Sequence, residues 1–201
     1  MNKNSYNQND EIYISNLVNV EAITDQFLID MRYSTKNNFA CKKVYSMSLC
    51  ILQKNTLKKL IKANEKFLKM GLRIKIWDAY RPLSTQKFFF DLIQNEDFVA
   101  NPYKGQGSVH SSGFAVDITL VDMNGEEIEM PTDFDDFTNK ASRNSTEMTK
   151  KASKNLSILT EILTENGFDT IESEWWHYKD TDAKTFTPLN FSFEEILNRL
   201  D

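Results

Sequence analysis

Histidine and cysteine are scarce in this 201-residue chain, which has two of each. Cys41 and Cys50 form no C-x-x-C pair, and two cysteines make no disulfide framework, so we expect free thiols in a reducing compartment. A net charge of -5 and a pI near 5.2 argue against a nucleic-acid-binding protein, which would show a basic patch. The longest apolar runs are far too short to cross a membrane.

The N-terminal segment is polar and rich in asparagine, and it lacks the basic and apolar regions of a signal peptide. We predict a disordered arm at residues 1–10 and one folded domain at residues 11–201. A hydrophobic content of 40%, with 14 Phe, is enough for a buried core. These observations predict a cytoplasmic protein with no nucleic-acid or membrane partner, and they leave its oligomeric state open.

The pattern of apolar residues predicts an α+β fold in a single domain. Apolar residues recur at helical spacing over residues 48–70, 84–94 and 145–166, and Ser192 with Glu195 forms a capping box that starts a helix reaching about residue 200. Strands are expected at residues 72–77, 114–121 and 170–178. Lysines from Lys54 to Lys69 follow the first helix and are interpreted as its solvated face. This order predicts a central, mainly antiparallel sheet with helices packed against it.

Both histidines stand close to a carboxylate. His110 precedes Asp117 by seven residues, and Gly113 between them can bend the chain so that the two side chains converge. Asp117 lies in an apolar strand, where a carboxylate is costly unless it is paired or metal-bound. The alternative for Asp117 is a turn cap or an arginine pair. Imidazole together with carboxylate is the usual ligand set of a hydrolytic zinc site.

The second histidine, His177, follows Glu174 by three residues in the segment EWWH. In a regular strand these two side chains point to opposite faces, so a bulge or a kink is required if both act on one metal centre. The two tryptophans between them are equally consistent with core packing. A zinc hydrolase needs three ligands and a carboxylate that is not a ligand, which His110, Asp117, His177 and Glu174 together supply.

Arg81 follows a predicted strand, at a position where a rigid element can present it to a site. Taken alone, an Arg-Pro pair in a loop is more typical of a surface arginine or a salt bridge than of a site. Its meaning depends on the motifs around it.

Four segments of the chain, in order, resemble those of the zinc D,D-peptidases, a family that includes D-alanyl-D-alanine dipeptidases and carboxypeptidases. SVHSSGFAVD at 108–117 resembles the motif S-x-H-x-x-G-x-A-x-D, and EWWH at 174–177 resembles E-x-W-H in its dipeptidase form. WDAYRP at 77–82 resembles W-D-G-Y-R-P, with Ala79 in place of the usual glycine. DMRYST at 30–35, with the following Asn38 and Phe39, resembles D-x-x-Y-x-T…N-F. The resemblance therefore covers most of the chain.

This resemblance implies the hydrolysis of a small D,D-dipeptide, D-Ala-D-Ala, with one zinc ion per chain. Glu174 would be the general base, and Arg81 would polarise the scissile carbonyl and stabilise the oxyanion. Ser108 and Asp135 would hold the substrate termini, with Asp135 facing a free ammonium. The implied zinc ligands are His110, Asp117 and His177.

Two other functions compete with a dipeptidase. A D,D-carboxypeptidase would remove the terminal D-Ala from peptidoglycan precursors and would need a longer, open groove. A non-catalytic zinc-binding or peptide-binding module is the alternative from another class. Glu174 and Arg81 argue against that module, because a purely structural zinc site needs neither residue.

Overall fold

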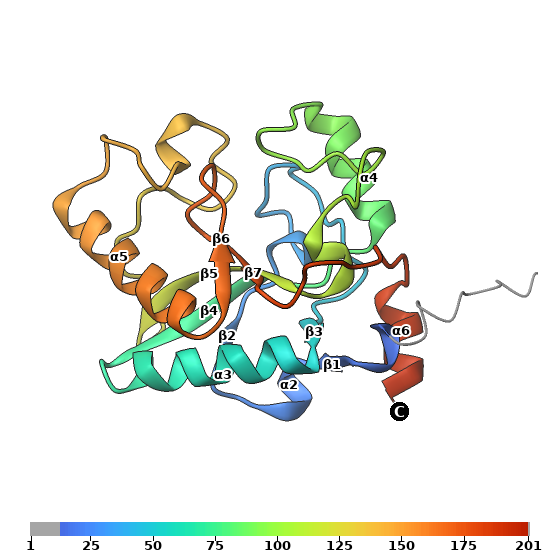
Figure 1. The fold of residues 1–201 in the computed structure, drawn as a ribbon, viewed down its shortest axis with the longest axis horizontal. Coiled ribbons are helices and arrows are strands. Elements are labelled where there is room, and N and C mark those ends of the chain that lie inside the picture. Colours follow the sequence, from blue (N-terminus) through green and yellow to red (C-terminus); the bar gives the residue numbers. More distant parts are fainter. Residues whose placement is uncertain (1–12, 201) are drawn as a thin grey trace, which may run out of the picture.

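A five-stranded sheet organises residues 13–200, the part of the chain that this computed structural model describes (Figure 1). The strand order is β2-β4-β5-β7-β6, and every neighbouring pair is antiparallel except β2–β4. The strands are β2 (Leu28–Ile29), β4 (Leu72–Asp78), β5 (Ala115–Asp122), β7 (His177–Asp180) and β6 (Phe168–Thr170). The predicted α+β fold with a mainly antiparallel sheet is confirmed. The arm predicted at residues 1–10 lies outside the described residues.

Two long helices, α3 (Lys54–Leu68) and α5 (Lys150–Glu165), pack against each other and against the sheet, α3 on β4 and α5 on β6. Each buries an apolar stripe with about one residue per turn. Lys54, Lys58 and Lys62 of α3 are exposed, as predicted, whereas Lys59 is half-buried and forms an ion pair with the buried Asp180. The remaining helical elements are α2 (Val20–Ile23), η1 (Arg32–Ser34), α4 (Leu83–Ile93), η2 (Val109–Ser112), η3 (Asn139–Ala141) and α6 (Phe193–Leu200).

A second, two-stranded sheet pairs β1 (Leu17–Asn19) with β3 (Ile51–Gln53). It supports η2, because Gln53 donates its backbone N–H to Gly113 O (2.9 Å) and its Nε2 to Ser112 O (2.8 Å). Gly113 has a φ of +76°, and a Cβ at this position would lie 2.8 Å from Cδ2 of Leu17. Only glycine fits both this backbone conformation and this close approach.

Strands β4 and β5 form the centre of the sheet, and every residue of β5 except Asp122 is buried. The pairing of these strands shifts register between Ile76 and Asp78, which places Asp78 opposite Asp117. A bulge of this kind redirects a side chain at the end of a strand. Here it brings two buried carboxylates to the same end of the two central strands.

Three predicted boundaries were wrong. The helix predicted from residue 48 begins at Lys54, because the apolar residues at 49–52 belong to β3 and the segment before it. The helix predicted from residue 145 begins at Lys150, where Thr149 caps it by accepting a hydrogen bond from the N–H of Ala152 (3.0 Å). The strand predicted at 170–178 is two strands, β6 and β7, joined by a turn.

The predicted capping box at the start of α6 is present. Ser192 donates its backbone N–H to Glu195, and the Ser192 hydroxyl accepts the backbone N–H of Glu195. None of the helices within residues 13–200 has the length and apolar character needed to span a membrane. In that same range Cys41 is exposed, Cys50 is buried, and both are free thiols, as predicted.

Candidate metal centre

His110 is carried by η2, and the local backbone fixes its orientation. Its Nδ1 lies 2.7 Å from the carbonyl oxygen of Ala79. A carbonyl can only accept, so Nδ1 carries the proton and Nε2 keeps its lone pair free. Gly113 then ends the turn by donating its N–H to His110 O (3.0 Å). Nε2 of this buried imidazole consequently faces the end of the central sheet.

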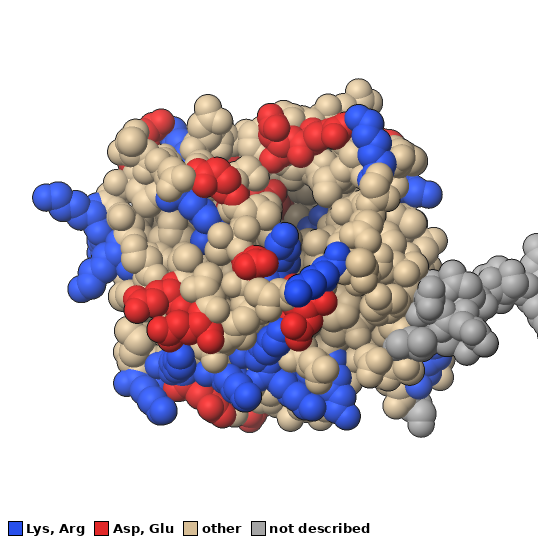
Figure 2. All heavy atoms as spheres, in the orientation of Figure 1, with Lys and Arg blue, Asp and Glu red and all other residues tan. Residues whose placement is uncertain are grey.

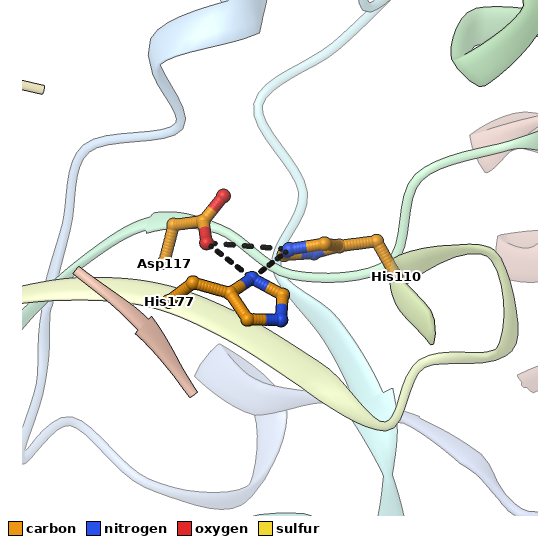
Figure 3. A group of neighbouring side chains, drawn as sticks. All are labelled: His110, Asp117 and His177. Carbon is orange, nitrogen blue, oxygen red and sulfur yellow. Dashed lines mark hydrogen bonds and ion pairs between the residues drawn. The ribbon is translucent and has the colours of Figure 1, made fainter. Parts of the chain in front are cut away.

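Asp117 and His177 are direct partners across β5 and β7, so their side chains leave the sheet on the same face. Figure 3 shows them converging with His110, which comes from outside the sheet. His177 Nδ1 lies 3.0 Å from Asp117 Oδ1 and 3.0 Å from His110 Nε2, and the third edge, from His110 Nε2 to Asp117 Oδ1, is 3.2 Å. The bend at Gly113 and the strand pairing together produce the convergence that the sequence requires.

This triangle of donor atoms fits a metal ion. Three lone-pair atoms held so close together repel one another unless a proton or a cation lies among them. Zinc at 2.0–2.1 Å from tetrahedral ligands would separate those ligands by roughly 3.3 Å, close to the observed edges. In the described part of the chain this is the group of three ligand side chains that can hold an ion, and all three side chains are buried.

The electrostatics of the triangle also favour a cation. Burial alone would raise the pKa of Asp117, but its electrostatic and hydrogen-bond interactions with the imidazoles of His110 and His177 outweigh burial and hold this pKa well below its usual range. Burial lowers the pKa of His177, which keeps the imidazole neutral and able to bind a metal. The centre therefore combines a fixed carboxylate charge with imidazole lone pairs.

Glu174 lies in the turn between β6 and β7, not within a strand. This turn lets it share the pocket with His177, and its Oε2 is 4.0 Å from His177 Nδ1. Burial, followed by the negative charge of Asp117, raises the pKa of Glu174 well above its usual value. Trp175 and Trp176 are buried core residues, which agrees with the structural interpretation of these tryptophans, although Trp176 also lines the pocket.

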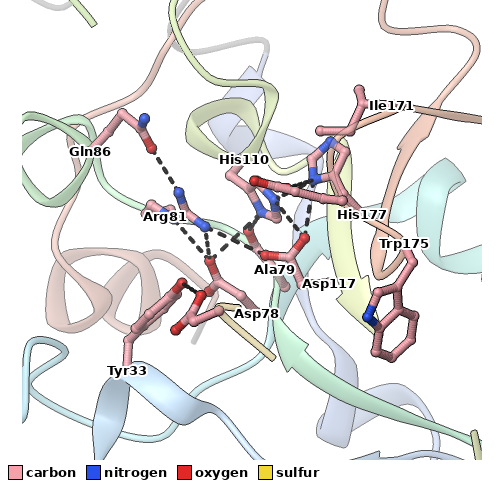
Figure 4. Close-up of polar contacts among 12 residues, drawn as sticks. Tyr33, Asp78, Ala79, Arg81, Gln86, His110, Asp117, Ile171, Trp175 and His177 are labelled. Atoms are coloured by element: carbon pink, nitrogen blue, oxygen red, sulfur yellow. Dashed lines mark hydrogen bonds and ion pairs between the residues drawn. The ribbon is translucent and has the colours of Figure 1, made fainter. Parts of the chain in front are cut away.

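Arg81 reaches the same pocket from the loop after β4 (Figure 4). Its Nε donates to Asp78 Oδ2 (2.9 Å), its Nη1 donates to Gln86 Oε1 (2.8 Å), and its Nη2 lies 3.5 Å from Asp117 Oδ2. The rings of Tyr33 and Phe89 lie against the guanidinium. Arg81 forms salt bridges, as the alternative interpretation of the sequence predicted. These salt bridges hold a buried positive charge beside the triangle of candidate ligands.

The pocket has a volume of about 320 Å³, and Ser108 and Asp135 line it together with the three candidate ligands, Glu174 and Arg81. Asp135 accepts the hydroxyl of Tyr33 (2.9 Å), and burial raises its pKa to about 7. The exposed Glu96 and Asp97 also line the pocket, and Figure 2 shows acidic side chains beside a hollow in this face. All seven residues singled out from the sequence therefore meet in one cavity.

Several residues that shape the pocket were missed by sequence reasoning. Asp78 stands beside Arg81 in the WDAYRP segment, so the motif contained a signal for it. Gln86 has no such signal, yet it is fully buried and links Arg81 to the carbonyl of Ala100 through its Nε2 (2.7 Å). Lys179, two residues beyond His177 on β7, lines the pocket as a second cation. Gln86 and Lys179 are not predictable without knowing which segments meet.

Comparisons with known proteins identify the family of this chain. The model of the peptidase family M15, described as D-ala-D-ala dipeptidase, matches residues 14–196. The D-alanyl-D-alanine dipeptidase of Escherichia coli (strain K12) is 30% identical over 177 residues, which cover 88% of this chain and 91% of that protein. The D-alanyl-D-alanine dipeptidase of Enterococcus faecalis is 27% identical over 172 residues, covering 76% of this chain and 85% of the relative.

Among solved structures, the vancomycin resistance D,D-dipeptidase VanXYg in complex with a D-Ala-D-Ala phosphinate analog is similar with a TM-score of 0.41 and 19% identity. That match covers 91% of this chain and 74% of the other.

Proposed function

Because this chain belongs to peptidase family M15, the family of D-Ala-D-Ala dipeptidases, we propose that it is a zinc metallopeptidase that hydrolyses the free dipeptide D-Ala-D-Ala. One observation carries the proposal within the structure. The buried triangle of His110, Asp117 and His177 forms the floor of a pocket that also holds a carboxylate, Glu174, and a cation, Arg81. A purely structural zinc site would need neither of these two.

One zinc ion per chain would be held by His110, Asp117 and His177. When bound, zinc supplies an electrophile that acidifies water and polarises a carbonyl oxygen. Because the chain supplies three ligands and not four, a bound ion would remain open to the reaction, as catalytic zinc sites require. The proton on Nδ1 of His110, which is directed at Ala79 O, keeps the ligand nitrogen Nε2 deprotonated and oriented.

Glu174 accepts the proton of the attacking water and returns it to the leaving amine. Its position suits this role, because it lies in the pocket 4.0 Å from a ligand nitrogen while standing outside the triangle. Its burial raises its pKa, which makes the carboxylate a stronger base than an exposed glutamate. Arg81 offers a fixed guanidinium to the developing oxyanion, and Asp78 and Gln86 hold it in place before substrate arrives.

The ends of the dipeptide carry opposite charges, and the pocket offers partners for both. Asp135 is the proposed partner of the free ammonium, and Ser108 helps to hold the other end of the dipeptide. Recognition of a free amino terminus would separate a dipeptidase from a carboxypeptidase, whose substrate continues in that direction.

The decisive experiment measures amine release from three substrates by the zinc-loaded protein. These are D-Ala-D-Ala, N-acetyl-D-Ala-D-Ala and a pentapeptide precursor that ends in D-Ala-D-Ala. The proposal predicts cleavage of the free dipeptide alone, and loss of that cleavage with a chelator. Cleavage of the pentapeptide at a comparable rate would instead identify a D,D-carboxypeptidase. Binding of zinc without cleavage of any of the three would identify a binding module.

The proposed catalytic domain spans residues 11–201. A free dipeptide substrate favours a cytoplasmic enzyme, because finished cell wall lies outside the cytoplasm. Cell fractionation with immunodetection tests this placement, and recovery with the envelope fraction would contradict it.

A further inference from the structure

Arg143, in the loop between η3 and α5, makes an unusually complete set of hydrogen bonds behind the pocket. Its Nε donates to Ile171 O (2.9 Å), and its Nη2 donates to both Trp175 O (2.7 Å) and His177 O (2.9 Å). Its Nη1 donates to the hydroxyls of Thr160 (3.0 Å) and Tyr178 (3.1 Å). The guanidinium therefore has no donor left for a substrate.

The three carbonyl acceptors belong to one short segment, residues 171–177, which turns the chain from β6 into β7. Glu174 lies inside this segment, and His177 ends it. A turn has few ladder hydrogen bonds, so its buried carbonyl groups need other donors. A guanidinium offers five N–H donors in a rigid planar fork, and hydrogen bonds from a charged donor are about twice as strong as neutral ones.

Other contacts hold the same guanidinium from behind. It lies over the ring of Tyr178, with Cζ 4.5 Å from the ring centroid, and Thr160 reaches it from α5. The backbone N–H of Arg143 also donates to Glu172 O (3.0 Å). The turn is thus tied at residues 171, 172, 175 and 177, on both sides of Glu174.

We propose that Arg143 is a positioning residue that fixes the separation of Glu174 and His177. Two residues three positions apart diverge in a strand, so their sharing of one pocket depends on the shape of this turn. Arg143 sets that shape from outside the pocket, through backbone carbonyls alone. The inference rests on the proposed roles of Glu174 as base and His177 as ligand.

Three variants test this inference, Arg143→Lys, Arg143→Ala and the matched control Arg73→Ala. Lysine keeps the charge, but a single ammonium cannot reach all three carbonyl groups. Arg73 is also partly buried, and it lies at the far end of β4 from the pocket. Circular dichroism selects folded protein, and zinc affinity is then measured by competition with a chromophoric chelator. The kinetic constants kcat and KM for D-Ala-D-Ala and the absorption spectrum of the cobalt(II) form complete the comparison.

We expect Arg143→Lys and Arg143→Ala to lose about 10–100-fold in zinc affinity or in kcat, the usual effect of removing a group that orients a metal ligand. KM should change little, the cobalt spectrum should shift, and guanidinium ion should restore part of the loss in Arg143→Ala. Arg73→Ala should match the wild type in each measurement. If Arg143→Ala does not fold, Arg143→Lys carries the test.

Wild-type zinc affinity, cobalt spectrum and kcat in folded Arg143→Lys would overturn the inference. A fall in thermal stability with none of these three changed would equally reduce Arg143 to a purely structural residue. Failure of the proposed function looks different, because the wild-type protein itself would then not cleave D-Ala-D-Ala. The zinc affinity and the cobalt spectrum would still report on the turn in that case.

Discussion

The pKa values of the pocket carboxylates are shifted in opposite directions on its floor, which holds Asp117, and on its wall, which holds Asp135 and Glu174. On the floor, the neighbouring imidazoles hold the pKa of Asp117 well below its usual range despite its burial. On the wall, burial raises the pKa of Asp135 to about 7 and that of Glu174 well above its usual value. The difference separates two tasks. The charged carboxylate of Asp117 can retain a cation, whereas Asp135, with a pKa of about 7, can exchange protons near neutral pH.

Removing a ligand from the floor should have the largest effect. Asp117→Asn keeps the shape of the side chain but removes the charge that the imidazoles stabilise, and we expect it to abolish tight zinc binding and hydrolysis together. Elemental analysis after gel filtration measures the bound zinc. Asp169→Asn, on the exposed surface of β6, is the control. One zinc ion per chain in Asp117→Asn would show that the floor does not depend on this charge.

Changing the wall at Glu174 should separate binding from chemistry. Glu174→Gln is expected to keep stoichiometric zinc and to lose about 10²–10⁴-fold in kcat, because the general base is gone while the ligands remain. Glu161→Gln, on the exposed face of α5, is the control, since Glu161 does not line the pocket. A Glu174→Gln protein with a near wild-type kcat would place the base elsewhere.

Arg81 stands between floor and wall, and its replacement should have a smaller effect. Arg81→Lys keeps one positive charge but cannot bind Asp78 and Gln86 together, as the guanidinium does. The expected loss is about 10²–10³-fold in kcat, as for the removal of one oxyanion donor. Zinc content should remain at the wild-type level. An unchanged kcat would mean that the guanidinium serves only to neutralise Asp78.

The smallest expected effect is on the free energy of unfolding, and it depends on Asp135 in the wall of the pocket. The pKa of Asp135 rises from 3.8 to about 7 on folding, so the folded state binds more protons between these values and loses stability as pH rises through them. Asp135→Asn removes this loss, and asparagine tolerates the φ of +61° at this position. Urea unfolding of the metal-free proteins should show equal stability near pH 4. Above pH 7 the variant should be more stable, by up to about 4 kcal/mol. A difference that does not depend on pH would refute the raised pKa.

The sequence predicted the fold class and the two central strands, but it did not predict the turn at residues 171–176. Period-two alternation in β4 and the apolar run in β5 gave both central strands, because burial imposes these patterns directly. The segment at 170–178 was wrongly predicted as one strand, since its apolar pattern fits a strand on either side of the turn. Arg143, about thirty residues away, donates hydrogen bonds to carbonyl groups of this turn, and no local pattern carries that information.

His110, Asp117, His177 and Glu174 were identified by type and spacing, whereas Ser108 and Asp135 followed only from the family resemblance. The convergence of these side chains was not predictable from the sequence. Strand alternation argued against a shared face for His110 and Asp117. The structure removes the difficulty by placing His110 outside the sheet, on a turn that Gly113 ends. Gln86 and Asp78 show the other limit, because the need for partners around a buried guanidinium is predictable while the identity of those partners depends on the fold.

The close contact between Gly113 and Leu17 has a practical consequence for protein engineering. The turn that carries the first histidine rests on the small β1–β3 sheet, so trimming the chain beyond Leu17 would remove the support of a residue nearly one hundred positions away. Affinity tags and fusion partners therefore belong upstream of this strand. The minimal active fragment must therefore include the β1–β3 sheet that supports the turn of His110, although the central sheet begins only at β2.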